Sequence, residues 1–248
     1  MAGLFGFFDY NKPGPGVSKD EPPKHRLFLF FEVYFRKFWK LVTLNIIYFI
    51  ACIPIVTIGP ATAGFTYVLR NFSREEHAWT VSDFKEHMFK NFKQGFIVSV
   101  INLLIFIIWG VATYFYRQML MEGSWIGNLF FLMLAAGLIF IIINFYIFEM
   151  MVTFRLSIRQ IYKNAFIFAM VRLPMNILML VIFALVAYGF YYYYLIGILL
   201  TPFIVISTLG FMVNFYVYPT IEKYMIKKVQ TQDPEEPQGI ENGEEQKE

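Results

Sequence analysis

The residue types that carry most enzyme chemistry are present in this sequence, but their spacing does not bring them together. The three histidines, His25, His77 and His87, lie in polar segments without metal-ligand spacing, and Cys52 is the only cysteine. The sequence contains no His-x-x-x-His or Cys-x-x-Cys pair and no Gly-x-x-x-x-Gly-Lys phosphate loop. No convincing set of serine, histidine and aspartate can be assembled either. We therefore expect no enzyme activity, no metal or other cofactor, and no nucleic-acid partner.

One acidic residue stands beside a long uncharged segment. Glu149 follows residues 123–148, which carry no charge. A carboxylate buried among membrane helices is a functional candidate by default. Because Glu149 lies at the very end of its uncharged run, next to polar sequence, we favour the alternative of a solvated helix end.

Asparagines and aromatic residues give the uncharged segments some polar character. The asparagines are Asn45, Asn102, Asn144, Asn176 and Asn214. Hydrogen bonds between helices explain them, and a polar path for transport is the rarer alternative. Tyr188 and residues 190–194 predict an aromatic belt at the membrane interface, although such rings could also stack on sugars.

Long apolar runs decide the class of the protein. Hydrophobic residues make up 58% of the 248 residues and charged residues 16%, against about 45–50% and 25% in an average soluble domain. Residues 95–116, 123–148 and 173–220 are free of charge. A helix needs roughly 20 residues to cross the hydrocarbon core of a bilayer, so the first two runs cross once each and the third crosses twice. The sequence predicts an all-α integral membrane bundle.

A short internal repeat relates the last two pairs of crossings. Residues 144–149 read NFYIFE, and residues 214–219, which lie 70 positions later, read NFYVYP. Upstream, FKN at residues 89–91 corresponds to YKN at residues 162–164. Each unit combines a basic amphipathic helix, two crossings and an aromatic-rich exit, as in membrane proteins built from repeated units. We therefore expect the hairpins 95–150 and 173–219 to form an internal repeat.

The first apolar segment, residues 41–72, contains residues that break a helix and residues that allow close packing. Proline and glycine interrupt it midway, and small side chains follow that could approach a neighbouring helix or a partner. The candidate helix-packing or partner-binding residues are Pro54, Gly59, Pro60, Thr62 and Gly64. We predict a broken or re-entrant hairpin here, and a single crossing followed by an interfacial helix stays open as the alternative.

The distribution of basic residues predicts the orientation. If residues 41–72 enter and return, every lysine and arginine except Arg117 falls on one side, which is the cytoplasmic side by the positive-inside rule. Three hairpins with about five to six membrane segments then leave both termini in the cytoplasm. The membrane domain spans residues 27–228 and starts with an interfacial helix at 27–40. Residues 1–26 are expected to be a flexible cytoplasmic N-terminus and residues 229–248 an acidic disordered tail.

Two basic helices are expected at the cytoplasmic surface. Their candidate docking residues are Lys85, Lys90, Lys93, Arg155, Arg159 and Lys163. They could hold a cytosolic partner, but attraction to anionic membrane lipids, at about 1 kcal/mol per basic residue, is the reading we favour.

The sequence around the broken hairpin resembles a known family. Residues 52–64 read CIPIVTIGPATAG and residues 67–70 read YVLR. This stretch resembles the signature of the YesL-like family, which comprises small polytopic membrane proteins of Gram-positive bacteria with a domain of unknown function. Residues 82–84, 89–94 and 163–165 are similar to the family as well, and the resemblance covers roughly residues 1–225.

The resemblance implies a role in carbohydrate uptake in the bacterial cell membrane. Family members are often encoded beside carbohydrate ABC importers, which are driven by ATP. On that association we expect an accessory membrane subunit that binds the permease subunits of such an importer and assists saccharide uptake. The alternative is an independent small-solute transporter or channel, which the repeat and the broken hairpin favour. A membrane-bound enzyme is a third possible class, but no residue pattern indicates it.

Overall fold

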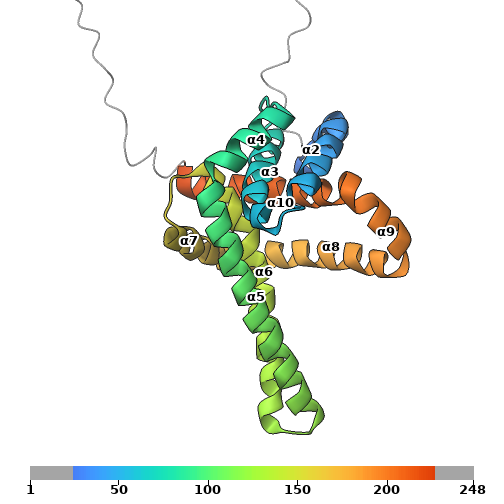
Figure 1. The fold of residues 1–248 in the computed structure, drawn as a ribbon, viewed down its shortest axis with the longest axis vertical. Coiled ribbons are helices and arrows are strands. Elements are labelled where there is room, and N and C mark those ends of the chain that lie inside the picture. The colour runs from blue at the N-terminus through green and yellow to red at the C-terminus, as the bar shows by residue number, and fades with distance from the viewer. Residues whose placement is uncertain (1–24, 227–248) are drawn as a thin grey trace, which may run out of the picture.

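The computed structural model describes residues 25–226, and this part of the chain consists of helices without any strand (Figure 1). Ten α-helices are present: α1 Arg26–Arg36, α2 Phe38–Ala51, α3 Ile58–Ser73, α4 Thr80–Lys90, α5 Phe92–Met121, α6 Leu129–Thr153, α7 Ile158–Val171, α8 Leu173–Tyr192, α9 Tyr194–Leu200 and α10 Ile206–Ile221. Short 3₁₀ turns cover Ile55–Thr57 and Trp125–Asn128, and π-helical turns cover Thr201–Val205 and Glu222–Ile226. Of the N-terminal segment 1–26, only the last two residues are described, and the acidic tail 229–248 lies outside the described residues.

Four of the described helical segments are long and apolar enough to cross a membrane. They are Phe92–Met121, Trp125–Thr153, Leu173–Tyr192 and Tyr194–Met225, and α2 is a shorter fifth apolar helix. Each of the four exceeds the 18 or so residues needed to span the hydrocarbon core. The prediction of an all-α membrane bundle is confirmed.

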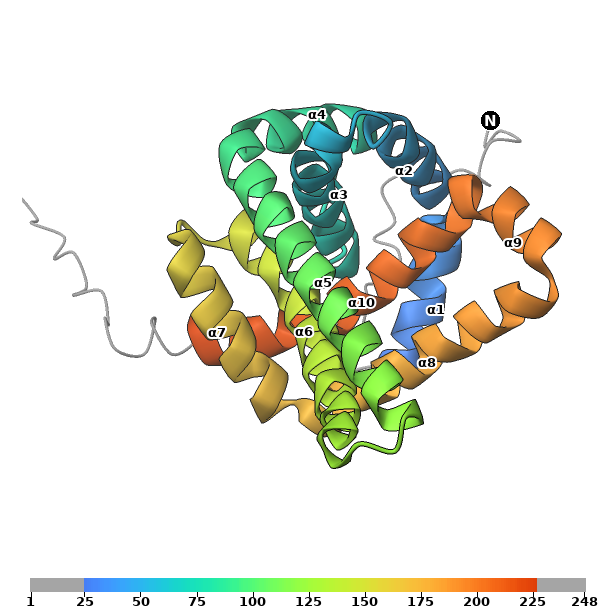
Figure 2. The same ribbon diagram turned by 60° about the horizontal axis from the view of Figure 1, so that its bottom comes forward.

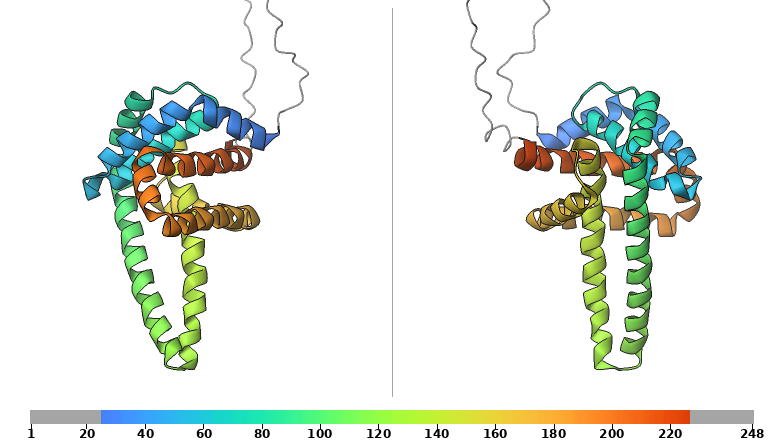
Figure 3. Two further views of the ribbon diagram at one scale, coloured as in Figure 1. Left: turned by 90° about the vertical axis from the view of Figure 1, so that its right-hand side faces the viewer. Right: turned by 60° about the vertical axis from the view of Figure 1, so that its left-hand side comes forward.

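The two long hairpins leave the bundle in different directions. Helices α5 and α6 run side by side away from the other helices and are joined by a turn at their far end (Figure 1). This hairpin is held together by the Trp109 Nε1–H group, which donates to the Met133 carbonyl at 2.7 Å, and by Gly137, which lies directly against the Trp109 ring. Helices α8 and α10, connected by α9, run across the direction of α5 and α6 (Figure 3). The outer parts of the two hairpins therefore do not pack on each other.

Helix α3 is the centre of the bundle. It lies among α2, α4, α5 and α10 in Figure 2, and most of its residues are buried. Its glycines let neighbouring backbones come close: Gly59 lies against Gly95 of α5, and Gly64 lies against Phe84 and Met88 of α4. Larger side chains of α3, such as Leu69, fill the core that it shares with α1, α2 and α10.

The first hairpin is broken, as predicted. Helix α2 ends at Ala51, and α3 begins at Ile58. Between them the Thr57 hydroxyl lies 2.5 Å from the Ala51 carbonyl and 2.6 Å from the Pro54 carbonyl, so that it can donate to either backbone acceptor at the turn. Helix α3 is surrounded by other helices, and most of its residues are buried.

The expected helix over residues 27–40 is divided in two. Helix α1 ends at Arg36, Lys37 forms the break, and residues 38–40 belong to the first turn of α2. At the break, the Lys37 ammonium lies over the Phe72 ring of α3, 5.3 Å from its centroid. Desolvation by burial and the neighbouring Lys40 lower the pKa of Lys37. The contact with a distant helix explains why periodicity within the segment did not indicate the break.

The two repeated units have the same order of elements but different junctions. Helices α4, α5 and α6 correspond to α7, α8 and α10. In the first unit Asn91 separates α4 from α5, whereas its counterpart Asn164 lies inside α7, which ends at Val171. The later break lengthens α7 and gives α8 a different direction from α5.

Candidate functional site

A pocket of about 320 Å³ lies where the broken hairpin meets the two repeated units. Residues of α2, α3, α6, α8 and α10 line it. Its polar residues are Tyr48, Thr62, Thr66, Asn144, Glu149 and Asn214, and its phenylalanines are Phe65, Phe145, Phe148 and Phe183. Pockets of this size with apolar walls and a few convergent polar groups are the usual form of small-molecule sites. We therefore treat this pocket as the candidate site.

Glu149 is the only residue with an ionisable carboxyl group in the lining of this pocket. Its relative exposure is 1%, and neither carboxylate oxygen has a hydrogen-bond partner. The prediction of a solvated helix end is wrong, because α6 continues to Thr153 and its end packs against α3, α7 and α10. A buried carboxylate without a partner is energetically costly, and groups of this kind commonly serve function.

The two asparagines of the sequence repeat both line the pocket. The Asn144 amide donates to the Phe140 carbonyl and the Asn214 amide to the Gly210 carbonyl, each at 2.8 Å and each four residues back in its own helix. The side-chain oxygen of Asn144 is satisfied by the Asn102 amide at 2.6 Å. The side-chain oxygen of Asn214 is buried and has no partner. The repeat thus brings two equivalent asparagines to one site. They differ because only Asn214 has a side-chain oxygen without a hydrogen-bond donor.

The remaining asparagines join helices, as predicted. Asn102 of α5 also accepts from the Tyr162 hydroxyl of α7 at 2.7 Å. Asn176 of α8 accepts from the Tyr146 hydroxyl of α6 at 2.8 Å. Asn45 of α2 donates to the carbonyl of Thr201 at 2.7 Å and accepts from the backbone of Ser207 at 2.6 Å, across the π-helical turn before α10.

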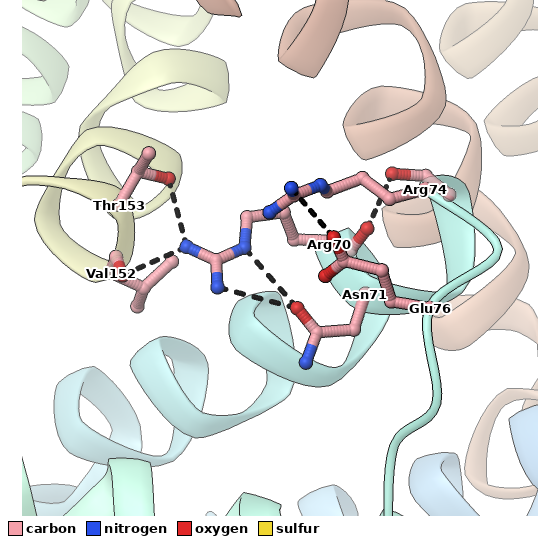
Figure 4. Close-up of polar contacts among 7 residues, drawn as sticks. Arg70, Asn71, Arg74, Glu76, Val152 and Thr153 are labelled. Atoms are coloured by element: carbon pink, nitrogen blue, oxygen red, sulfur yellow. Dashed lines mark hydrogen bonds and ion pairs between the residues drawn. The ribbon is translucent and has the colours of Figure 1, made fainter. Parts of the chain in front are cut away.

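Arg70 is a buried cation whose role was missed from sequence. Its guanidinium donates to the Val152 carbonyl at 2.9 Å and to the Thr153 hydroxyl at 3.1 Å, and it also contacts the Asn71 side chain (Figure 4). The group also lies over the Tyr67 ring, 4.6 Å from its centroid. Unpaired carbonyls at a helix C-terminus attract cations, so Arg70 fixes the end of α6 against α3.

Removing the Arg70 guanidinium is expected to destabilise the bundle. Arg70→Met leaves the Val152 carbonyl without its charged donor and should lower the free energy of unfolding by about 3 kcal/mol. Arg74→Met is the matched control, because Arg74 forms its ion pair with Glu76 at the surface, where such pairs contribute about 0–1 kcal/mol. Denaturant unfolding in detergent measures both, and equal losses would contradict the buried role of Arg70.

Most of the predicted packing residues are buried between helices of this protein. Gly59, Pro60 and Gly64 are buried, and Thr62 is half-buried with its hydroxyl 3.1 Å from that of Tyr48. They pack against α2, α4 and α5, so the buried positions offer no free surface to another protein. Pro54 alone of these predicted residues is exposed, in the turn of the broken hairpin.

The six predicted docking residues come from two regions that the fold brings together. All six are exposed, and within residues 25–226 none of them forms an ion pair. The Gln94 amide at the start of α5 donates to the Leu156 carbonyl before α7 at 2.8 Å, which places Lys93 and Arg155 in neighbouring segments. Over the same described range, no group of three or more His, Cys, Asp or Glu side chains is placed to hold a metal ion.

Comparisons with known proteins concern one part of the chain. Searches among curated proteins and among solved structures find no match. Residues 41–113 match the model of a family described as "Protein of unknown function, DUF624". This range contains the broken hairpin, α4 and most of α5, but not Glu149 or Asn214. Over these residues the chain is similar to a protein family of unknown function.

Proposed function

We propose that the protein is an accessory membrane subunit of a carbohydrate ABC importer and that it binds the importer's permease subunits. The association with carbohydrate uptake comes from the resemblance to the YesL-like family, and the match over residues 41–113 is consistent with that family. We place the protein in the bacterial cell membrane with both termini in the cytoplasm, because the basic residues then lie on the cytoplasmic side.

The observation that carries this proposal is the divergence of the two long hairpins. In the most apolar stretch of each candidate span, 17% of residues are buried in Phe92–Met121, Trp125–Thr153 and Tyr194–Met225, and 11% in Leu173–Tyr192. Membrane helices associate through van der Waals packing of close-fitting surfaces. A hairpin such as α5–α6, which projects from its own bundle, presents two such surfaces to helices of another subunit (Figure 1).

Gly110 offers a specific contact point on this hairpin. It is exposed on α5, and no atom lies within 4 Å of the position that a Cβ would occupy. Small residues on membrane helices allow close approach of a second helix. Gly189 on α8 is half-buried, but no atom lies within 4 Å of its Cβ position either, which makes it a control in the other hairpin.

Affinity purification from the native membrane in a mild detergent, followed by mass spectrometry, tests the proposal. We expect the two permease subunits of a carbohydrate importer in stoichiometric amounts with the wild-type protein and with Gly189→Trp. Gly110→Trp should lose most of the permease while its own thermal unfolding is unchanged. Purification of the protein without any permease would overturn the proposal.

A second candidate function is that of an independent small-solute transporter or channel. The pocket beside Glu149 favours it, because transporter sites lie between repeated units next to broken helices. Solute flux into proteoliposomes that contain this protein alone, lost in Glu149→Gln, would support this function over the first. Absence of flux for a range of neutral and charged solutes would contradict it.

A further inference from the structure

The pocket around Glu149 contains buried hydrogen-bond acceptors that have no donor. Both carboxylate oxygens of Glu149 and the side-chain oxygen of Asn214 are buried without partners. Among the donors of the lining, the amides of Asn144 and Asn214 each bind a carbonyl of their own helix. The Thr62 hydroxyl binds the Ile58 carbonyl at 2.7 Å and lies 3.1 Å from the hydroxyl of Tyr48. Because buried acceptors are normally satisfied, a ligand for this pocket has to supply donors.

The pocket also holds an acidic group that has no basic partner among the lining residues. Glu149 contributes a carboxylate, and no lysine, arginine or histidine is among the lining residues. The nearest arginines on α3 are committed elsewhere, because Arg70 binds the end of α6 and Arg74 pairs with Glu76 at 2.6 Å. Burial in an apolar environment favours the neutral form of such a carboxyl group, and a cation beside it favours the ionised form.

The walls of the pocket favour an organic cation over a metal ion. Four phenylalanines line it; the Phe145 and Phe183 rings meet edge to face at 5.4 Å, and the Phe65 ring lies 4.4 Å from the ring of Tyr48. Aromatic faces attract ammonium groups through their quadrupoles. Calcium needs six to eight oxygen ligands and magnesium an octahedral set, and three free acceptors do not supply them. The volume of about 320 Å³ accommodates a small molecule rather than a bare ion.

We propose that this pocket binds a small molecule with a positively charged nitrogen, with Glu149 as its counter-ion, Asn214 as a further acceptor and the phenylalanines as aromatic walls. Such a nitrogen occurs in free amines and in the amine headgroups of lipids. The site is distinct from the proposed contact with permease subunits at Gly110, which is not among the residues that line the pocket.

Thermal unfolding of the purified protein in a maltoside detergent tests the site, in phosphate buffer so that no buffer amine competes. Choline and ethanolamine are the probes, with glucose and sodium chloride as controls. We expect a saturable rise of the unfolding midpoint with at least one of the amines and none with glucose or with sodium chloride at matched ionic strength. A parallel set in nanodiscs compares phosphatidylethanolamine with phosphatidylglycerol, and stabilisation by the first lipid alone identifies the headgroup as the source of the amine.

Variants separate the site from general effects on folding. Glu149→Gln should weaken amine binding about tenfold or more, which corresponds to the loss of one charge-assisted contact. Glu122→Gln, at an exposed carboxylate in the α5–α6 turn, should bind as the wild type does. Asn214→Leu removes the second free acceptor without changing a charge and should weaken amine binding severalfold. It provides the test if Glu149→Gln fails to fold. The proposal is overturned if no amine or amine lipid stabilises the protein, if Glu149→Gln responds like the wild type, or if glucose stabilises as well as the amines do.

Discussion

Alanine in place of Gly59 is expected to lower the free energy of unfolding by about 3 kcal/mol or more, because a methyl group there has no room. The added Cβ would overlap the carbonyl oxygen of Gly95 and would lie 2.7 Å from the carbonyl carbon of Gly95 and from the Cβ of Ser99. Overpacking costs about 1–3 kcal/mol when side chains can yield, and more when the obstacle is backbone. Helices α3 and α5 would have to separate along their contact. Denaturant unfolding in detergent, followed by circular dichroism, measures the loss.

The same substitution at two other glycines provides the comparison. Gly64→Ala should be comparably damaging, since its Cβ would meet the Phe84 carbonyl oxygen and lie 3.1 Å from the backbone nitrogen of Met88. Gly110→Ala should be neutral or stabilising by up to about 1 kcal/mol, because the site is open and alanine favours the helix. If Gly59→Ala proves as stable as Gly110→Ala, the close contact between α3 and α5 does not exist.

Glutamine in place of Glu149 is expected to stabilise the protein without its ligand, by about 1–3 kcal/mol. The carboxylate is buried and neither of its oxygens has a partner. Glutamine has nearly the same shape and cannot ionise, whereas folding forces the glutamate either to bury a charge or to take up a proton, and both are costly. The free energy of unfolding of both proteins, measured in detergent and amine-free buffer, checks the sign of the difference.

The exposed carboxylate of Glu122 again serves as the control. Glu122→Gln should change stability by less than about 0.5 kcal/mol, as surface substitutions usually do. A loss of stability in Glu149→Gln would mean that the carboxylate has a favourable partner in the folded protein. In excess choline the difference should shrink by about 1.4 kcal/mol or more, because the ligand stabilises the wild type more than the weaker-binding variant.

The local part of this fold could be predicted from sequence. The uncharged runs gave the long helices, since length and composition alone decide whether a helix can cross a bilayer. Pro54 and the Gly59–Pro60 pair located the break in the first hairpin, because their backbone chemistry acts within a few residues. The asparagine repeat identified two positions that do share a site.

The parts that were missed depend on helices far apart in the chain. Glu149 looked like a solvated end because its uncharged run stops there, yet its burial is decided by α3, α7 and α10. At the break, Lys37 contacts Phe72. The role of Arg70 depends on its hydrogen bonds to Val152 and Thr153. Periodicity within one segment carries no information about such partners. The different directions of the two hairpins were missed for a related reason. They differ at the connections that precede α5 and α8, whereas the repeat was recognised from short matching segments.

The central position of α3 has a consequence for how the chain is made. This helix is completed early in synthesis, at Ser73, but its neighbours include α5, α6 and α10, the last of which ends at Ile221. Until α6 is made, the buried Arg70 lacks the Val152 carbonyl and the Thr153 hydroxyl to which it donates. Unsatisfied polar groups are costly in hydrocarbon. We therefore expect the nascent helix to stay near the polar headgroups while later segments insert. Biogenesis of this protein would then end with the middle of the bundle closing around a segment made near its start.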